Sequence, residues 1–309
     1  MKRVVITGAT SMVGVALIEQ CIENGVQVLA LVRKNSNKCN RLPISKLVTI
    51  SECNLNELKY YNSFKGEYDV FYHLGWSNTD RAGRCDARKQ IENIEYSLDA
   101  IQLAHKLGCT KFVGAGSQAE YGIHKEPKTK PTSELNPQDA YGISKVAAGK
   151  LCSSEAIKMN MDFSWVRIFS LYGKYELPGT LIQTVLPRML RNEYCALTEG
   201  SQEWDYLYSS DAGKAFFLVG EKASGNKIYC LGQGEAHPIK QYILKIKKLT
   251  NSKSELGFGD IPYYGEKPKG MCADITELCN DVGWQPETTF ESGILKEIER
   301  IKGMTNEEN

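Results

Sequence analysis

The sequence predicts an α/β fold, a doubly wound parallel sheet with a smaller α/β portion at its C-terminal end. Short runs rich in β-branched residues alternate with amphipathic helical stretches through the N-terminal half. A glycine-containing turn joins the first of these runs to the first helical stretch. The 309 residues are 42% hydrophobic and 24% charged, which is typical of a globular protein with one large or two modest domains.

Charge, hydropathy and cysteine usage argue against several classes of function. The net charge of +1 gives no reason to expect nucleic acid or a membrane surface as partner. No apolar run is long enough to span a bilayer, and Met1-Lys2-Arg3 leads directly into a strand-like segment, unlike a secretory signal. The ten cysteines form no Cys-x-x-Cys pair and there are only four histidines. We therefore expect a cytoplasmic protein with reduced thiols and no metal site.

The first strand, Lys2–Thr7, runs into a glycine turn and then a helix that includes Val15–Cys21. Strand, glycine turn and helix in this order are typical of a Rossmann-type cradle, in which the helix N-terminus holds a pyrophosphate. A lone glycine pattern of this kind can equally be only a turn, and Ser11 stands where the usual pattern has its middle glycine. The candidate cofactor-binding residues here are Gly8, Thr10, Ser11, Met12, Val13 and Gly14.

The second strand, Val26–Val32, ends at Arg33-Lys34. In NAD-binding cradles an acidic residue at this place accepts hydrogen bonds from the adenosine ribose. Arg33 instead offers a forked donor for a 2′-phosphate, and Lys34 adds a second charge. The sequence therefore favours NADPH, with NAD as the alternative if these two residues are only a solvated strand end.

The next strands predict where the cofactor and a reacting group meet. After a short third strand, Asn54 and Leu55 stand where such cradles close over the adenine. The fourth strand, Tyr68–Gly75, should pass beneath the cofactor at its end, where Leu74, Gly75 and Trp76 lie, and we interpret its His73 as a core residue. A helix follows over Ala87–Leu107, and a fifth strand over 111–116 delivers Ser117 at its carboxyl end.

Tyr141 and Lys145 are four residues apart and would share one face of a helix. An ammonium beside a phenol favours the phenolate and lowers its pKa towards the range of a general acid/base. Ser117 can donate a hydroxyl to the same substrate oxygen. This trio suits proton transfer to or from an oxygen while hydride moves to or from a nicotinamide, although most Tyr-x-x-x-Lys matches are simply solvated helix surface.

Several motifs together give the chain a specific resemblance. They occur in one order over nearly the whole chain: Thr7–Gly14, His73–Gly75, Ser117–Gly122, Tyr141–Lys145, Arg167–Gly173 and Trp204–Asp211. In these motifs the chain resembles the extended short-chain dehydrogenase/reductases, and among them the NAD(P)-dependent sugar-nucleotide epimerase/dehydratase family.

The resemblance implies roles for particular residues. Tyr141 would be the general acid/base, Lys145 would lower its pKa and hold the nicotinamide ribose, and Ser117 would bind the reacting oxygen. Phe169 and Leu171 would lie in the loop that meets the nicotinamide. In that loop Ser170 stands where relatives commonly carry Asn. Gln118 and Tyr121, beside Ser117, would touch the sugar or serve only in packing.

The resemblance also implies a cofactor-binding domain and a substrate-binding domain. Residues 1–172 with 205–232 would bind the dinucleotide, and residues 173–204 with 233–309 the substrate. Arg188 is a candidate partner for the substrate diphosphate, with solvated surface as its alternative. Trp204 replaces a frequent phosphate-binding arginine and would stack on a nucleobase or belong to the core. A nucleotide sugar is the implied small-molecule partner, and a homodimer the implied assembly.

Three functions follow as hypotheses. The first is NADPH-dependent reduction of a nucleotide-linked 4-keto-6-deoxysugar at C4. It rests on Arg33-Lys34 and on the absence of dehydratase features, since Gln118-Ala119 replaces the Asp-Glu pair with which related dehydratases eliminate water. The second is an NAD-dependent sugar-nucleotide 4-epimerase, against which Arg33 argues. The third is a non-catalytic dinucleotide sensor, which the presence of both Tyr141 and Lys145 disfavours.

Overall fold

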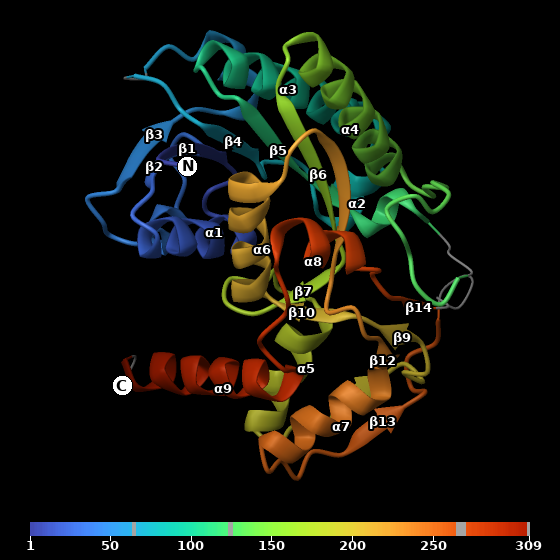
Figure 1. The fold of residues 1–309 in the computed structure, drawn as a ribbon. Helices are drawn as coiled ribbons and strands as arrows, with labels where there is room; N and C mark the ends of the chain where they lie inside the picture. The colour runs from blue at the N-terminus through green and yellow to red at the C-terminus, as the bar shows by residue number, and fades with distance from the viewer. Residues whose placement is uncertain (64–65, 123–125, 264–269, 308–309) are drawn as a thin grey trace.

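The computed structural model describes residues 1–63, 66–122, 126–263 and 270–307, and within them seven parallel strands form one central sheet (Figure 1). Their order across the sheet is β11-β6-β5-β4-β1-β2-β3. The strands are β1 (Arg3–Thr7), β2 (Gln27–Val32), β3 (Val48–Glu52), β4 (Val70–His73), β5 (Lys111–Ser117), β6 (Asp162–Ile168) and β11 (Asn226–Leu231). The doubly wound parallel sheet predicted from the sequence is confirmed.

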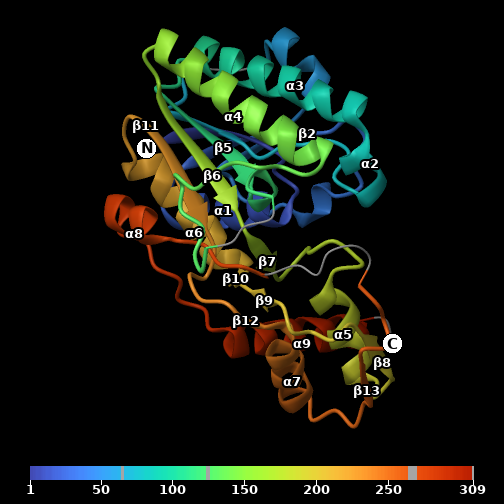
Figure 2. The same ribbon diagram turned by 90° about the vertical axis from the view of Figure 1, so that its right-hand side faces the viewer.

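Helices cover both faces of this sheet (Figures 1 and 2). One pair packs together on the first face, α1 (Met12–Glu23) with α6 (Ser209–Lys222), and a second pair on the other, α3 (Ala87–Lys106) with α4 (Ala140–Lys158). Successive strand residues point to opposite faces, so Val4 and Ile6 join the core under the first pair while Val5 joins the core under the second. Burial on both faces explains why the strands are nearly continuous apolar runs.

The strand order reverses beside β1, which pairs with β2 on one side and with β4 on the other. In open sheets of this type ligands bind at the carboxyl ends of the strands around such a switch point. The candidate site residues that follow β1, β2, β4 and β5 all lie at this edge.

A smaller portion lies below the central sheet in Figures 1 and 2 and has its own core. It contains α5 (Leu181–Leu190), α7 (Ile239–Leu249) and α9 (Phe290–Glu307). Aromatic rings pack together within its mostly aliphatic interior: the centroids of Tyr242 and Phe290 lie 4.5 Å apart and those of Tyr206 and Tyr242 5.1 Å apart. The remaining elements are η1 (Cys39–Arg41), η2 (Leu55–Tyr60), α2 (Arg81–Cys85), η3 (Gln118–Glu120), β7 (Ser170–Tyr172), β8 (Cys195–Leu197), β9 (Glu203–Trp204), β10 (Tyr206–Tyr208), β12 (His237–Pro238), β13 (Leu256–Phe258), β14 (Gly270–Met271) and α8 (Thr276–Val282).

Two features are absent from the described residues. No helix there combines the length and apolar character that crossing a bilayer requires. No three His, Cys, Asp or Glu side chains converge there in a way that would hold a metal ion.

Candidate active site

The glycine turn after β1 is held by close backbone contacts. Gly8 has φ of +67°, and a Cβ at this residue would lie 2.6 Å from the carbonyl carbon of Leu74. A Cβ at Gly14 would lie 2.4 Å from the carbonyl oxygen of Gly8. Ser11 caps α1, because its Oγ accepts a hydrogen bond from the N–H of Gly14 at 3.0 Å. The turn thus presents the start of α1 to a ligand, and it fits the pyrophosphate cradle that the sequence predicts for Gly8, Thr10, Ser11, Met12, Val13 and Gly14.

A chain of buried hydrogen bonds supports the end of β4 beneath this turn. The N–H of Gly75 donates to Thr7 Oγ1 (3.2 Å), and Thr7 Oγ1 lies 2.9 Å from His73 Nδ1. On the other side of the ring, Nε2 lies 3.2 Å from Ser97 Oγ, whose hydroxyl donates to the carbonyl of Asn93. Burial lowers the pKa of His73 to about 3, so the ring is neutral. The structure therefore places His73 in the core, as interpreted from the sequence.

The residues after β2 divide into free and paired cations. Arg33 is exposed at the end of β2. Lys34 instead forms an ion pair with Glu57 at 2.6 Å, and its backbone N–H donates to Asn54 Oδ1 at 3.1 Å. Leu55 reaches the end of β4, since its Cδ2 would lie 2.8 Å from a Cβ at Gly75. Of the two predicted phosphate ligands, only Arg33 presents its charge without a carboxylate partner among the described residues.

Arg41 is a cation near the glycine turn that the sequence did not single out. Its guanidinium donates to the carbonyl of Thr10 at 3.4 Å and lies 4.7 Å from the centroid of the Tyr175 ring. Tyr175 has φ of +69°, which is strained for an aromatic residue. With Asn37, Lys38 and Asn40, these two side chains line a cavity of about 300 Å³. Arg41 thereby connects the glycine turn to the loop after β7.

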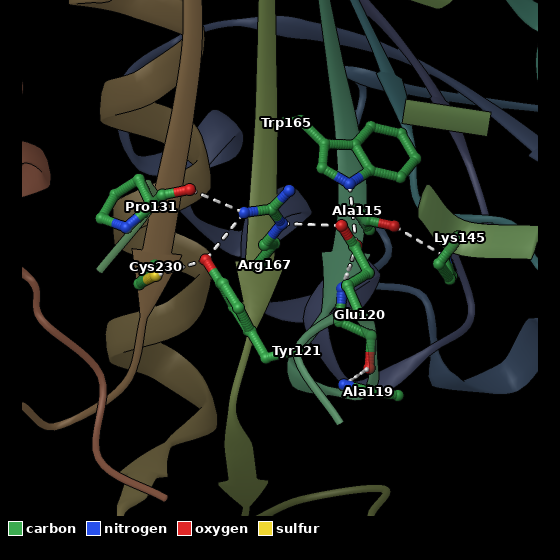
Figure 3. A network of polar contacts seen from close by, with 10 residues as sticks. Ala115, Ala119, Glu120, Tyr121, Pro131, Lys145, Trp165, Arg167 and Cys230 are labelled. Carbon is green, nitrogen blue, oxygen red and sulfur yellow. Dashed lines mark hydrogen bonds and ion pairs between the residues drawn. The ribbon is translucent and has the colours of Figure 1, made fainter. Parts of the chain in front are cut away.

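Helix α4 brings Tyr141 and Lys145 to the carboxyl end of β5. Asp139 caps the helix by accepting from the N–H of Gly142 at 2.7 Å, which places Tyr141 in the first turn. Lys145 is buried, and its ammonium donates to the carbonyl of Ala115 on β5 at 2.6 Å (Figure 3). The same nitrogen lies 3.6 Å from the centroid of the Trp76 ring. Ser117 shares a side-chain hydrogen bond with Tyr141, so the structure brings all three predicted catalytic residues together.

The protonation of the pair differs from the expectation that Lys145 lowers the pKa of Tyr141. Burial raises the pKa of Tyr141, and the hydrogen bond with Ser117 and the charge of Arg84 offset this rise only in part. Burial also lowers the pKa of Lys145 to about 7. The phenol is thus the neutral-pH form of Tyr141, and Lys145 titrates near neutrality.

Arg84 is a second residue that the sequence analysis missed. Its guanidinium carbon lies 4.2 Å from the centroid of the Tyr141 ring, and its Nε lies 3.9 Å from a carboxylate oxygen of Asp139. It comes from the short helix α2, whose position against α4 depends on tertiary packing. No spacing signal in the sequence connects it with Tyr141.

A cavity of about 380 Å³ begins close to Ser117. Ser117 pairs with Ile168 in the sheet, and the cavity begins two residues later at Ser170. It brings together three predicted ligand contacts, Ser170, Leu171 and Trp204. The other lining residues are Glu176, Thr180, Leu181, Gln202, Tyr206 and Ile239. Burial raises the pKa of Glu176, the acidic member of this lining.

Four other predicted residues lie outside this cavity. Gln118 is half-buried beside Ser117. Tyr121 and Phe169 are buried in a small apolar cluster, which favours packing over ligand contact. Arg188 is exposed on α5 and donates to the carbonyl of Tyr194 at 3.4 Å, as expected for the surface alternative.

Comparison with known proteins agrees with this architecture. Residues 4–232 match the NAD dependent epimerase/dehydratase family. The chain is 26% identical to a dTDP-4-dehydro-6-deoxyglucose reductase of Escherichia coli over 97% of both chains. It is 23% identical to an uncharacterized UDP-glucose epimerase of Bacillus subtilis over 98% of both. The structure of UDP-glucose 4-epimerase with UDP-glucose from Thermotoga maritima superimposes with a TM-score of 0.87 at 21% identity, covering 98% of this chain and 99% of that one.

The family match covers more than half of the chain, and it includes the glycine turn, Ser117, Tyr141 and Lys145. The resemblance drawn from the sequence motifs is therefore confirmed. The protein belongs to the NAD-dependent epimerase/dehydratase family, and it is an enzyme of the extended short-chain dehydrogenase type that acts with a nicotinamide cofactor.

Proposed function

We propose that the enzyme reduces the C4 ketone of a nucleotide-linked 4-keto-6-deoxysugar with NADPH. The observation that carries this proposal is the hydrogen-bonded pair of Ser117 and a protonated Tyr141 at the carboxyl end of β5. A phenol with a raised pKa keeps its proton at neutral pH, so Tyr141 carries the proton that reduction of a ketone requires. The reductase of Escherichia coli, similar over nearly its whole length, supports the same reaction class.

The residues of this chain supply the proton and the orientation. A bound nicotinamide cofactor supplies the hydride. Ser117 donates a hydrogen bond to the ketone oxygen and polarises the carbonyl. Tyr141 transfers its phenolic proton to that oxygen as negative charge develops there, so the ketone becomes an alcohol. Lys145 in its ammonium form stabilises the phenolate that remains.

The residues after Ser117 argue against a dehydratase. Gln118 and Ala119 have side chains that neither donate nor accept a proton at neutral pH. Elimination of water from the sugar needs an acid and a base placed next to the substrate. The half-buried Gln118 amide suits substrate orientation instead.

A direct assay tests the proposed reaction. The enzyme should oxidise NADPH in the presence of a dTDP-, CDP-, GDP- or UDP-linked 4-keto-6-deoxysugar. Reduction of each ketone consumes one proton, which Tyr141 supplies, and one hydride, which NADPH supplies. Loss of absorbance at the reduced nicotinamide band, with one alcohol product formed per NADPH, is the expected result. Absence of turnover with all four nucleotides would contradict the proposal.

A 4-epimerase is the second candidate, because the relative in Bacillus subtilis is called a UDP-glucose epimerase. Its reaction begins with removal of a proton from an alcohol, for which Tyr141 would have to ionise. An epimerase retains its cofactor through the cycle. Purified protein that carries bound NAD and interconverts C4 epimers without net cofactor consumption would establish the epimerase in place of the reductase.

Arg33 provides the specific prediction for cofactor choice. Arg33→Asp should lower the ratio of kcat/KM for NADPH to that for NADH by about tenfold to a hundredfold, since a charge-assisted hydrogen bond contributes about 1.5–3 kcal/mol. Steady-state kinetics with both cofactors measure the ratio. Arg191→Asp, the same change on the exposed end of α5, should leave it unchanged. An unaltered ratio in Arg33→Asp would make this arginine a surface residue only.

Two expectations from the family resemblance remain part of the proposal. The segments 173–204 and 233–309 would bind the sugar nucleotide, and the cavity between Ser170 and Trp204 supports this division. A homodimer would pair α3 and α4 with their copies. Ile91 on α3 and Ile143 and Ile157 on α4 are exposed, which supports an apolar contact there.

A further inference from the structure

A buried carboxylate lies directly behind Ser117. Glu120 ends η3, three residues after Ser117, and its side chain is fully buried. Its Oε1 accepts hydrogen bonds from the backbone N–H of Ser117 at 2.8 Å and from the indole N–H of Trp165 at 2.9 Å. Ser117 Oγ in turn accepts from the N–H of Ala119 at 3.2 Å. The turn that carries the reacting hydroxyl is therefore closed from both of its ends.

The second carboxylate oxygen anchors this turn to the neighbouring strand (Figure 3). Oε2 of Glu120 accepts from Arg167 Nε on β6 at 2.6 Å, and both side chains are almost completely buried. The same guanidinium donates to the hydroxyl of Tyr121 at 2.8 Å and to the carbonyl of Pro131 at 2.9 Å. The Tyr121 hydroxyl also lies 3.1 Å from the Cys230 sulfur on β11. One carboxylate thus connects η3 and, through Arg167, the strands β6 and β11.

The backbone of β5 leaves room for this arrangement. A Cβ at Gly116 would lie 2.6 Å from Glu120 Oε1 and 2.5 Å from Trp165 Nε1. Only a glycine lets the carboxylate and the indole approach the strand so closely. A buried ion pair stabilises a fold little or not at all relative to apolar side chains of the same volume. Stability alone therefore gives no reason to place a charge here.

We propose that Glu120 is a positioning residue for the acid–base pair: it fixes Ser117 towards Tyr141 and places a buried carboxylate behind the segment of β5 that Lys145 binds. Lys145 donates to Ala115, two residues before Ser117 on the same strand, so the carboxylate and the ammonium act on one short segment of β5. The assignment rests on the proposed roles of Tyr141 and Lys145, and it extends them to a residue that touches neither substrate nor cofactor.

The charges around Lys145 give the sign of the effect. Burial lowers the pKa of Lys145, the charge of Glu120 raises it, and the charge of Arg84 lowers it. Glu120 likewise raises the pKa of Tyr141. Removal of this one negative charge therefore lowers the pKa of both groups. Among the described residues, five titratable or charged groups act on Tyr141 and Lys145 or on their neighbours. They are His73 on β4, Arg84 on α2, Glu120 on η3, Asp139 before α4 and, bound to Glu120, Arg167 on β6.

The titration of Lys145 tests the proposal without a substrate. Glu120→Gln keeps the shape of the side chain and removes its charge. The ε-carbon resonance of Lys145 in 13C-lysine-labelled protein, assigned with Lys145→Arg, should titrate near pH 7 in the wild type and about one pH unit lower in Glu120→Gln. With a ketosugar substrate, the pH profile of kcat/KM should move in the same direction.

Glu297→Gln is the matched control. Glu297 is a buried carboxylate of α9 that accepts from Arg300 at 2.7 Å and from the Tyr208 hydroxyl at 3.2 Å, in the core of the smaller portion. It should cost stability as Glu120→Gln does, yet leave the titration of Lys145 unchanged.

A second variant keeps the test informative if Glu120→Gln does not fold. The double variant Glu120→Gln/Arg167→Met removes both buried charges and retains their volume. Its Lys145 should also titrate below the wild-type value, because Glu120 is the member of the pair whose charge acts on Lys145. A wild-type titration of Lys145 in either folded variant would overturn the proposal, whatever the reductase assay shows.

Discussion

Tyr141→Phe should reduce turnover by about a thousandfold while it leaves the fold and the affinity for cofactor nearly unchanged. The substitution removes the phenolic oxygen and retains the ring, which packs edge-on against Trp76 with centroids 6.0 Å apart and lies under the guanidinium of Arg84. A positioned general acid contributes about 10²–10⁴ to a rate, and Tyr141 is the group whose side-chain hydrogen bond with Ser117 places it at the reacting oxygen. Stability should fall by only about 1 kcal/mol for the lost hydrogen bond to Ser117.

Three measurements check this expectation: NADPH oxidation with a ketosugar, cofactor affinity by fluorescence titration, and urea unfolding. Tyr61→Phe is a matched control, because it removes a mostly buried hydroxyl that bonds to Ser51 and to the carbonyl of Ser63, away from the site. Its turnover should equal that of the wild type. If Tyr141→Phe retained more than roughly a tenth of the activity, Tyr141 would not be the acid.

Gly14→Ala should weaken cofactor binding more than tenfold and lower the free energy of unfolding by about 1–3 kcal/mol. The new Cβ would lie 2.4 Å from the carbonyl oxygen of Gly8 and 2.7 Å from that of Ala9. Both are backbone atoms, so no side chain can rotate away and the glycine turn itself has to move. A Cβ at Gly8 would likewise lie 2.6 Å from the carbonyl carbon of Leu74 and 2.7 Å from the nitrogen of Gly75, so the other side of the turn is also packed against backbone.

Gly303→Ala provides the comparison for this variant. Gly303 also lies within a helix, α9, but a Cβ there would meet no atom within 4 Å. Alanine should therefore stabilise that helix by up to about 1 kcal/mol and leave cofactor binding as it is. Urea unfolding and titration with NADPH measure both effects. Equal stability changes in the two variants would show that the contact between Gly14 and Gly8 imposes no constraint.

The sequence predicted the parts of the site that depend on local order along the chain. The turn after β1 and the spacing of Tyr141 and Lys145 are short-range patterns, and the order of strands and helices limits the sheet to few topologies. The helix expected over Ala87–Leu107 extends over Ala87–Lys106 in the structure. Such features need no knowledge of what approaches them from elsewhere in the chain.

Other features depend on contacts between segments that are distant in sequence, and the sequence did not predict them. Arg84 reaches Tyr141 only because α2 packs against α4. The pKa of Tyr141 is raised because the side chain is buried, and the five-residue motif gives no information on burial. Aspartate is common at helix N-caps, yet Asp211 lies in the first turn of α6. Its carboxylate accepts instead from the backbone N–H groups of Glu287 and Thr288. Each of these contacts joins segments that are distant in sequence.

The place of β11 in the sheet has a consequence for synthesis of the protein. β11 is an edge strand next to β6, but 57 residues separate Ile168 from Asn226. Until the ribosome has released residue 231, the nascent chain presents β6, with its buried Phe163 and Trp165, as an open and largely apolar edge. Translation must therefore continue through residues 173–204, the first of the two segments of the smaller portion, before this edge is covered. Ribosome-bound chains that stop near residue 200 should be the ones that engage chaperones.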